Sequence, residues 1–402
     1  MADDARRTRV VCHLIERLDY GGAEMLVHSL TTGLQQRGYR SIVCCLQAGA
    51  IAGRLEHDGV RVHCLDLQRP SILEGPRFGR FVVAAVRGLA RIVESEHVDI
   101  IHAHMPDPII WAAAAGRLTH TAVVGTYHGH GNLPKGRRRW DPRNAIRRLL
   151  YRSAGAVSDR TIAVSGAVRD WLCREMGFDE RKTVRLLNGV DTRAFARAQG
   201  SDQVRAELGL DGRAVIVSVG RLVRGKAHRY LVDAMTIVAR RHPNAVLVLV
   251  GDGPERGRLE QQVRDLALTD RVRFAGTRPD IPTLLAMSAV FVLPSFSEGI
   301  PIALIEAMAA GTPVVATAVP GSLDVVVDER HGRLVPPGDA REIADAIGAV
   351  LADPAGAAER AARAQARVRA SFDIEQAIAA TARLYDEVLA ERAAANGGHR
   401  AR

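Results

Sequence analysis

Cysteine is scarce in this chain of 402 residues, which has five, and no two of them form a C-x-x-C pair. Their number is odd, and four lie in apolar, strand-like runs where buried thiols are common. A secretory signal is also missing, because two acidic residues precede the first short apolar run and no small-residue cleavage site follows it. These absences favour a reducing compartment, and we expect a cytoplasmic protein.

No apolar stretch is long and uninterrupted enough to predict a membrane span. The nearest candidate, residues 299–321, carries Glu306 as its single charge, but three prolines and an internal glycine interrupt it. We expect a buried helix, a turn and a strand in this interval.

Acidic residues are in deficit. The 45 aspartates and glutamates face 55 lysines and arginines, which leaves a net charge of +10. This excess argues for an anionic partner but does not separate a nucleotide from a nucleic acid or a membrane surface. With 47% hydrophobic and 25% charged residues, the composition is that of a globular protein, which excludes wholesale disorder and a coiled coil.

The length exceeds what one hydrophobic core usually fills, roughly 250 to 300 residues. Short apolar runs alternate with helical patterns, which indicates parallel sheets covered on both faces. We therefore predict an α/β protein of two doubly wound, Rossmann-like domains with functional loops at the carboxyl ends of the strands. The predicted strands are 10–15, 41–46, 60–65, 99–103, 122–126, 161–164, 214–219, 245–250, 271–274, 290–293 and 313–316.

The alternation weakens between Asp191 and Gly212 and then resumes with a clean strand. We place the domain boundary near residue 195, which gives domains at 1–195 and 196–370. The Ala- and Arg-rich segment 339–392 is predicted as consecutive helices. The last part of the chain, 371–402, is predicted as a helix followed by a frayed tail at 393–402.

The strongest functional signal is the segment 297–315. A strand comes before it, a polar loop carries Glu298, Gly299 lets the backbone approach a ligand, and Pro301 suits the first position of a helix. The free amides of such a helix start favour a diphosphate, while Glu298 and Glu306 offer acceptors to sugar and ribose hydroxyls. The alternative is a solvated Glu298 and a helix with one polar residue, which we disfavour because apolar residues flank Glu306.

A second loop, residues 220–226, directly follows a strand and combines glycines with the cations Arg221 and Lys226. It has the logic of a phosphate loop, but Ala227 stands where G-x-x-x-x-G-K-[ST] requires a hydroxyl, which disfavours a nucleoside triphosphatase. The alternative is that these cations are ordinary solvated loop charges. We disfavour it because the same half of the chain also contains the Glu298 loop.

Five motifs in the second half resemble the donor half of a family 4 glycosyltransferase of the group 1 type, with the GT-B fold. They are 220–221 with 226, 251–255, 274–281, 298 with 306, and 331–339. The first half is similar through 21–24, 101–104, 126–129, 163–165 and 188–191, so the resemblance covers nearly the whole chain. It implies two Rossmann-like domains that face each other across a cleft, an acceptor domain at 1–195 and a nucleotide-sugar domain at 196–370. It also implies that the last helix packs back on the first domain.

The resemblance implies catalytic roles for four residues. Arg221 and Lys226 would hold the donor diphosphate, Glu298 would contact the donor sugar, and His128 would reach the transferred sugar. With His104, His128 would also line the acceptor cleft.

Further donor-binding positions follow from the same resemblance. Glu306 would bind the ribose, the loop from Arg278 to Ile281 resembles the nucleobase pocket, and the Gly21–Gly22 loop resembles one that closes over the phosphates and the acceptor. The complete implied donor set is Gly21, Gly22, Arg221, Lys226, Arg278, Ile281, Glu298, Gly299, Ile300, Pro301 and Glu306. The chain departs from the family at Ala227, Ser322 and Asp324, where glycine, glycine and glutamate are usual.

The sequence contains no D-x-D metal motif, so Arg221, Lys226 and helix amides would have to stabilise the leaving diphosphate. We therefore predict metal-independent catalysis without a cofactor and with a UDP- or GDP-sugar as donor. The family retains the anomeric configuration, and the motifs offer no carboxylate pair of the kind that retaining hydrolases use. The leaving phosphate is then the expected base for the acceptor hydroxyl.

The histidines of the first half allow alternative interpretations. His128 would be a satisfied core histidine if it did not reach the sugar. His102 and His104 lie two apart on one strand face and, with His128 and His130, hint at a metal site. Because no cysteine or carboxylate converges on them, we expect them to line the acceptor cleft and predict no metal.

The segment 135–152 holds eight cations and one acid, with apolar and aromatic side chains at helical spacing. This pattern is typical of a helix that lies on an anionic membrane surface. A solvated charged helix with a core-facing leucine stripe is an equal alternative. Nucleic-acid binding is disfavoured, because interleaved stacking aromatics and a reader motif are missing.

We predict a retaining glycosyltransferase that moves a hexose or N-acetylhexosamine from a nucleotide diphosphate sugar to a hydroxyl of a saccharide or lipid-linked saccharide, in bacterial polysaccharide or glycolipid synthesis. One alternative is a sugar-nucleotide epimerase or hydrolase of the same fold. Another is a non-catalytic sugar-nucleotide-binding subunit, against which the joint presence of Arg221, Lys226, Glu298 and Glu306 argues. If 135–152 binds lipid, we expect a peripheral protein on the inner face of the cytoplasmic membrane.

Overall fold

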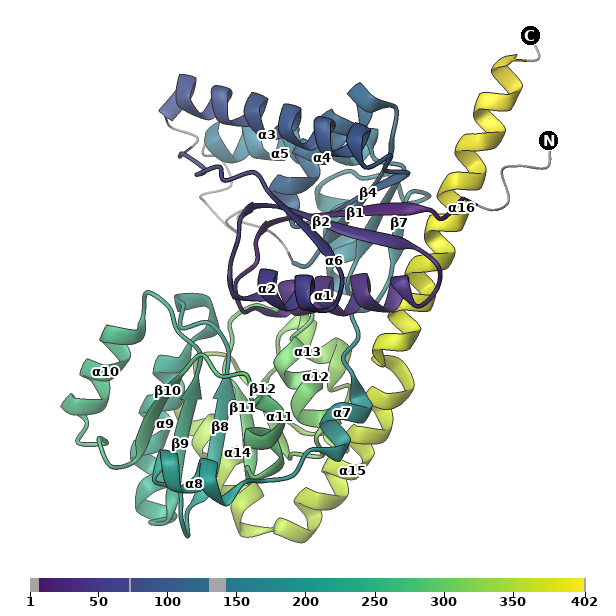
Figure 1. Cartoon of the computed structure of the whole chain (residues 1–402). Coiled ribbons are helices and arrows are strands. Elements are labelled where there is room, and N and C mark those ends of the chain that lie inside the picture. The colour runs from purple at the N-terminus through teal and green to yellow at the C-terminus, as the bar shows by residue number, and fades with distance from the viewer. Residues whose placement is uncertain (1–6, 72–73, 130–141, 401–402) are drawn as a thin grey trace. The chain divides into compact units, whose positions relative to one another are not determined.

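The computed structural model describes residues 7–71, 74–129 and 142–400 (Figure 1). The chain divides into two compact units, which we call unit 1 (Met1–Leu187 with Glu375–Arg402) and unit 2 (Asn188–Ile374). The division comes before the predicted boundary at residue 195. The chain enters and leaves unit 2 side by side, because the Val190 amide donates to Phe372 O and the Ile374 amide donates to Val190 O, both at 2.9 Å.

Unit 1 contains a sheet of seven parallel strands whose inner members are buried along most of their length. Near-continuous burial requires helices on both faces, and Figure 1 shows α3, α4 and α5 on one face and α1 and α2 on the other. In spatial order the strands are β3 (Arg61–Cys64), β2 (Arg40–Gln47), β1 (Val10–Arg17), β4 (Ile100–His104), β5 (Ala122–Tyr127), β6 (Arg160–Ala163) and β7 (Thr183–Arg185). The helices are α1 (Gly22–Gln35), α2 (Ala50–His57), α3 (Gly75–Ser95), α4 (Pro106–Thr119), α5 (Pro142–Val157), α6 (Gly166–Asp170) and the π-helical turn Trp171–Glu175.

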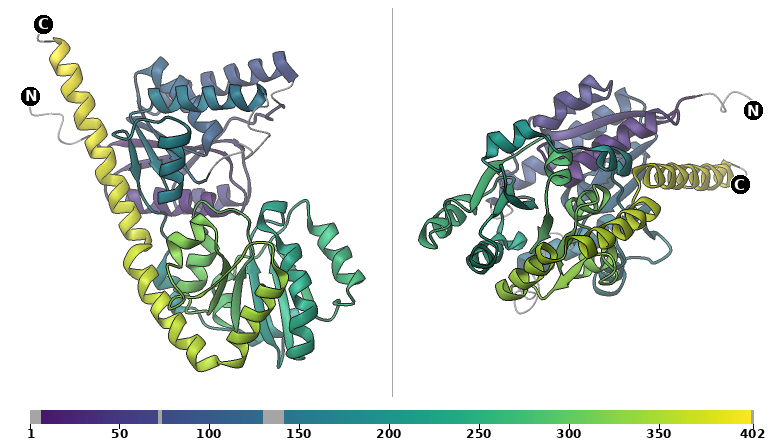
Figure 2. Two further views of the ribbon diagram at one scale, coloured as in Figure 1. Left: turned by 180° about the vertical axis from the view of Figure 1, so that it is seen from behind. Right: turned by 90° about the horizontal axis from the view of Figure 1, so that it is seen from below.

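The last helix, α16 (Ile374–Arg400), packs on unit 1 from Glu375 onward (Figure 2). Tyr39 donates to Asp386 Oδ1 at 2.6 Å, and a Cβ on Gly33 would lie 2.2 Å from Ile378 Cδ1. Of the frayed tail predicted at 393–402, the structure describes the part up to Arg400 as the last turns of α16.

Unit 2 contains a sheet of six parallel strands. In spatial order they are β10 (Val272–Gly276), β9 (Ala245–Val250), β8 (Ala214–Val219), β11 (Val290–Leu293), β12 (Val314–Thr317) and β13 (Arg333–Val335). The helices are α7 (Thr192–Arg197), α8 (Asp202–Leu208), the 3₁₀ turn Arg224–Lys226, α9 (His228–Arg241), α10 (Arg256–Asp265), α11 (Ile281–Ala286), α12 (Ile302–Ala309), α13 (Pro320–Val325), α14 (Ala340–Ala352) and α15 (Pro354–Ser371). Side chains of α9, α10 and α14 form one continuous core with β8 to β12.

The two sheets confirm the predicted pair of doubly wound, Rossmann-like domains. In each sheet the strand order reverses once, between β1 and β4 in unit 1 and between β8 and β11 in unit 2. Ligands of such folds bind outside the carboxyl ends of the strands at the reversal. The topology therefore directs attention to the loops after these four strands.

The interval 299–321 forms α12 and β12, as the sequence predicts. None of the helices in the described part of the chain has both the length and the apolar character that crossing a membrane requires.

Candidate active site

Two predicted residues, 72 positions apart in sequence, meet at the strand-order reversal of unit 2. Lys226 follows β8, Glu298 follows β11, and Lys226 Nζ donates to Glu298 Oε1 at 2.7 Å. The Glu298 side chain is 8% exposed and that of Lys226 29%, so this ion pair is shielded on one partner and open on the other. Backbone pairing ties the two loops together, because the Phe296 amide donates to Gly225 O at 2.9 Å. The loops therefore hold a cation and a carboxylate at a fixed separation.

Glycine is required where the loops after β8 and β9 touch. A Cβ on Gly251 would lie 2.2 Å from Gly220 O, and one on Gly253 would lie 2.5 Å from Leu222 O. Both glycines have positive φ, at 126° and 157°. This contact fixes the backbone on both sides of Arg221, which is exposed and forms no ion pair within the described part of the chain. The guanidinium is thus presented to solvent from a rigid turn.

Ala227 adopts the left-handed conformation, with φ of 55°, and is buried. That conformation favours glycine, which accounts for the glycine that is usual at this position in the family.

The predicted donor residues after Glu298 lie in a closely packed turn. The helix begins at Ile302, one residue later than predicted, and Pro301 is its N-cap. Ile300 and Pro301 are buried, and a Cβ on Gly321 of α13 would lie 2.7 Å from Gly299 O. The backbone of this turn is therefore shaped by α13 as well as by its own sequence.

Glu306 lies on α12 and is partly buried. Removal from water raises the pKa of its carboxyl from 4.5 to about 7. A carboxyl in such a place is a strong acceptor for a hydroxyl that reaches it, because few other groups compete.

Arg278 is held by two carboxylates. Its guanidinium donates to Asp280 at 2.8 Å through both Nε and Nη2, and to Glu207 at 2.6 and 3.2 Å. These bonds raise the pKa of Arg278 and fix the loop that leads into Ile281, the first residue of α11. The assignment of this loop to a nucleobase stays a prediction.

In unit 1, Gly21 is the N-cap of α1 and Gly22 its first residue. The Glu24 carboxylate folds back over this helix start, since its Oε2 would lie 2.3 Å from a Cβ on Gly21. Both glycines follow β1, one of the two strands at the reversal of this sheet.

The structure places His104 and His128 together, with His128 Nε2 3.4 Å from His104 Nδ1. His104 has no exposed surface, whereas His128 is partly exposed. Residues 130–141, which include His130, lie outside the described residues. His102 lies beside His104 and contacts Tyr385 and Thr126 instead.

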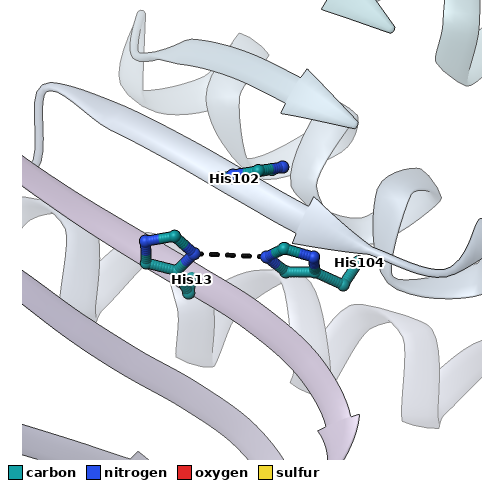
Figure 3. A group of neighbouring side chains, drawn as sticks. All are labelled: His13, His102 and His104. Atoms are coloured by element: carbon teal, nitrogen blue, oxygen red, sulfur yellow. Dashed lines mark hydrogen bonds between the residues drawn. The ribbon is translucent and has the colours of Figure 1, made fainter. Parts of the chain in front are cut away.

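Sequence reasoning missed His13, which the parallel register aligns with His102. His13, His102 and His104 are completely or almost completely buried and form a compact group (Figure 3). A single histidine in an apolar strand gave no signal, because the register between β1 and β4 cannot be read from sequence.

Comparisons with known proteins cover both units. The family model described as "Glycosyltransferase Family 4" matches residues 20–194, and that described as "Glycosyl transferases group 1" matches residues 201–369. The chain is 30% identical over 271 residues to the UDP-Gal:alpha-D-GlcNAc-diphosphoundecaprenol alpha-1,3-galactosyltransferase of Escherichia coli, covering 66% of this chain and 69% of that protein. It is 28% identical over 356 residues to the 2-deoxystreptamine N-acetyl-D-glucosaminyltransferase of Streptomyces fradiae, covering 83% of each.

Solved structures share the fold. HepE of Anabaena, in complex with UDP and glucose, superposes with a TM-score of 0.80 at 24% identity, covering 94% of this chain and 100% of that chain. Sucrose-phosphate synthase of Thermosynechococcus elongatus gives a TM-score of 0.78 at 24% identity, covering 95% of this chain and 100% of that chain.

Proposed function

Because this chain belongs to the group 1 glycosyl transferases, we propose that it moves a hexose or N-acetylhexosamine from a nucleotide diphosphate sugar to an acceptor hydroxyl with retention of configuration. The observation that carries the proposal is the Lys226–Glu298 pair beside the exposed Arg221 at the strand-order reversal of unit 2. A nucleotide diphosphate presents about two negative charges and a sugar presents hydroxyls, which suit cations and a shielded carboxylate respectively.

The chemistry proposed for these residues is stabilisation of the leaving group. As the bond between the anomeric carbon and the diphosphate oxygen breaks, negative charge grows on that oxygen, and the proposed role of Arg221 and Lys226 is to offset this charge. The acceptor oxygen forms the new bond on the same face of the sugar and passes its proton to the departing phosphate. Glu298 orients the sugar, and Glu306 accepts from the ribose.

The proposed donor is a UDP- or GDP-sugar. In support, HepE of Anabaena has been crystallised in complex with UDP-glucose, and that structure matches this chain at 25% identity with a TM-score of 0.77. We also propose that catalysis needs neither metal nor cofactor, because the cations that would neutralise the diphosphate are supplied by the chain itself.

A lipid-linked saccharide is the proposed acceptor, and the cytoplasmic membrane surface the proposed place of action. The Escherichia coli relative is named for a diphosphoundecaprenol acceptor. On α5 of this chain, Ile146 and Leu149 are 52% and 66% exposed, and the cations Arg147 and Arg148 lie between them in sequence. Exposed apolar side chains among cations suit an anionic bilayer. Residues 135–141 of the predicted basic segment lie outside the described residues.

A product assay tests the proposal against its alternatives. Purified protein is first screened by thermal shift with UDP, GDP and their common sugars, because a ligand of the folded state raises the apparent melting temperature. The sugar nucleotide that stabilises most is then incubated with undecaprenyl-diphosphate-linked saccharide in excess chelator, and products are separated by mass and anomeric configuration. A glycosylated acceptor with retained configuration is expected.

Three other outcomes would each contradict a stated part of the proposal. Free sugar at the same rate with and without acceptor indicates a hydrolase, and an epimerised sugar nucleotide indicates an epimerase. Tight nucleotide binding without turnover on any acceptor indicates a binding subunit. A strict requirement for Mg²⁺ or Mn²⁺ would overturn the metal-free mechanism alone.

A further inference from the structure

Three imidazoles form a row from the interior of unit 1 to His128. His13 Nδ1 lies 3.2 Å from His104 Nε2, and His104 Nδ1 lies 3.4 Å from His128 Nε2. Neighbouring ring planes are close to parallel, at 16° and 24°, and each pair of rings brings one nitrogen of each within hydrogen-bond distance. Figure 3 shows the inner contact, between His13 on β1 and His104 at the end of β4.

All three side chains are neutral near pH 7. Burial lowers the pKa of His13 to about 3 and that of His128 to about 4, and holds the pKa of His104 well below its usual range. A neutral imidazole has one N–H and one bare nitrogen. A hydrogen bond between two imidazoles needs one of each, so each contact in the row contains a single proton.

Because His104 uses both of its nitrogens, the row has only two consistent arrangements. In the first, protons point outward: His13 Nδ1–H donates to His104 Nε2, and His104 Nδ1–H donates to His128 Nε2. In the second, every donor and acceptor is reversed, and His128 loses the proton from Nδ1.

The far end of the row selects between them. His13 Nε2 is buried and has no hydrogen-bond partner within the described residues. In the inward arrangement this atom would be an unpaired N–H, whereas in the outward one it is an unpaired acceptor. Unpaired buried N–H groups are the rarer of the two in proteins, because a donor without an acceptor is the costlier loss. The outward arrangement is therefore favoured.

We propose that His13 and His104 are positioning residues that fix His128 in the tautomer with its proton on Nδ1, ready to donate to an oxygen of the bound substrate. The proposal rests on the proposed function only in giving His128 a substrate to meet. It assigns buried His104 a role through His128 in place of the predicted direct contact with the acceptor.

His102 is not part of the row. Its Nδ1 lies 2.5 Å from the Tyr385 hydroxyl and its Nε2 lies 2.6 Å from Thr126 Oγ1, so both nitrogens already have partners. This also argues against a metal ion held by His13, His102 and His104, because His102 would have to give up a hydroxyl to offer a lone pair.

Nitrogen NMR of protein labelled with ¹⁵N-histidine tests the tautomer directly. We expect the Nδ1–H form for His128 in the wild type and in His104→Gln, whose amide can still accept on one side and donate on the other. In His104→Leu we expect His128 to change toward the Nε2–H form that a free histidine side chain prefers. His57→Gln, on the exposed end of α2, is the matched control and should leave the His128 signal unchanged.

Kinetics supply the second readout. His104→Leu should lower kcat roughly tenfold, the loss expected from one misdirected hydrogen bond, with little change in KM for the donor. His104→Gln should recover most of that loss. If His104→Leu does not fold, His104→Met serves in its place, because its side chain likewise offers no N–H to His128.

The failures are distinguishable. An unchanged His128 tautomer in folded His104→Leu or His104→Met overturns the positioning role, whatever the activity. If the His128 tautomer changes in His104→Leu but the wild-type protein transfers no sugar, the positioning role stands and the proposed function is overturned. Stoichiometric metal in purified wild type that is lost in His102→Leu overturns the proton row in favour of a metal site.

Discussion

At the scale of single residues, Arg221 and Lys226 are the groups on which the proposed chemistry depends most. We expect Arg221→Ala and Lys226→Ala each to lower kcat/KM at least tenfold, because removing one preorganised donor to a developing anion costs roughly 2.7 to 4 kcal/mol. Steady-state kinetics and thermal unfolding measure activity and folding separately. Arg224→Ala is the matched control, since Arg224 lies in the same turn with an 80% exposed side chain. Wild-type turnover in either test variant would remove these residues from the mechanism.

Glu306 connects ligand binding to stability. Its pKa rises from 4.5 to about 7 in the folded state, so the folded protein binds more protons than the unfolded chain between these values. The free energy of unfolding should therefore fall as pH rises from 4.5 to 7 and then stay level with respect to this group. The upper limit of the loss is about 3 kcal/mol.

Glu306→Gln should abolish that pH dependence. At pH 8 the ligand-free variant should be more stable than the wild type, and at pH 4 the two should be similar, as urea unfolding at both pH values can measure. Calorimetric titration with nucleotide should show weaker binding by the variant, because an amide replaces a charged acceptor to a hydroxyl. Equal nucleotide affinity would sink the ribose assignment, whereas an unchanged stability profile would contradict the raised pKa alone.

At the scale of elements, the loops after β8 and β9 depend on glycine. In Gly251→Ala a methyl group would meet Gly220 O, and a backbone with φ of 126° strains any L side chain. We expect a loss of stability of at least about 1 kcal/mol and weaker donor binding, because the turn that carries Arg221 must shift.

Gly257→Ala is the matched control for this change. Gly257 lies on α10, is exposed and has open space around its Cβ position. Alanine there should stabilise the protein by about 0.5 to 1 kcal/mol, because glycine is a poor helix residue. If both variants were equally stable, close approach of the two loops would not be a determinant of unit 2.

Sequence patterns predicted elements best where burial is continuous. The strands 214–219, 245–250 and 290–293 have the predicted bounds, because an unbroken apolar run has no other place than a covered parallel sheet. The edge strands β7 and β13 have three residues each, too few for the sequence to show a periodic pattern. Glu207 was missed for a different reason: it comes from α8, in the polar segment where no pattern was visible, and meets Arg278 only through tertiary packing.

The same distinction holds for the site. Lys226 and Glu298 could be paired from sequence because both follow strands of one sheet, and topology brings such loops together. The histidine row could not, since it needs the register of β1 against β4 and of β4 against β5. Spacing along the chain thus predicts which loops converge, whereas contacts between side chains on neighbouring strands require the structure.

At the scale of the whole molecule, the net charge of +10 and the exposed apolar residues of α5 lead to a prediction about membranes. The protein should cosediment with vesicles that contain acidic lipid and bind neutral vesicles poorly. Binding should weaken as salt rises, because charges are screened within about 10 Å at 0.1 M. Each cation near the surface is worth about 1 kcal/mol, so Arg147→Gln with Arg148→Gln should lower vesicle affinity by more than tenfold.

A variant of equal charge separates a local surface from a general attraction. Arg240→Gln with Arg264→Gln removes two exposed cations from unit 2 and should leave vesicle binding nearly unchanged. Leu149→Ser should weaken binding at high salt as well, because it removes an apolar side chain that would insert into the bilayer and leaves the charge unchanged. If the two arginine pairs had the same effect, net charge alone would explain the attraction; if neither acidic lipid nor Leu149 mattered, α5 would be a solvated helix and a water-soluble acceptor would be favoured.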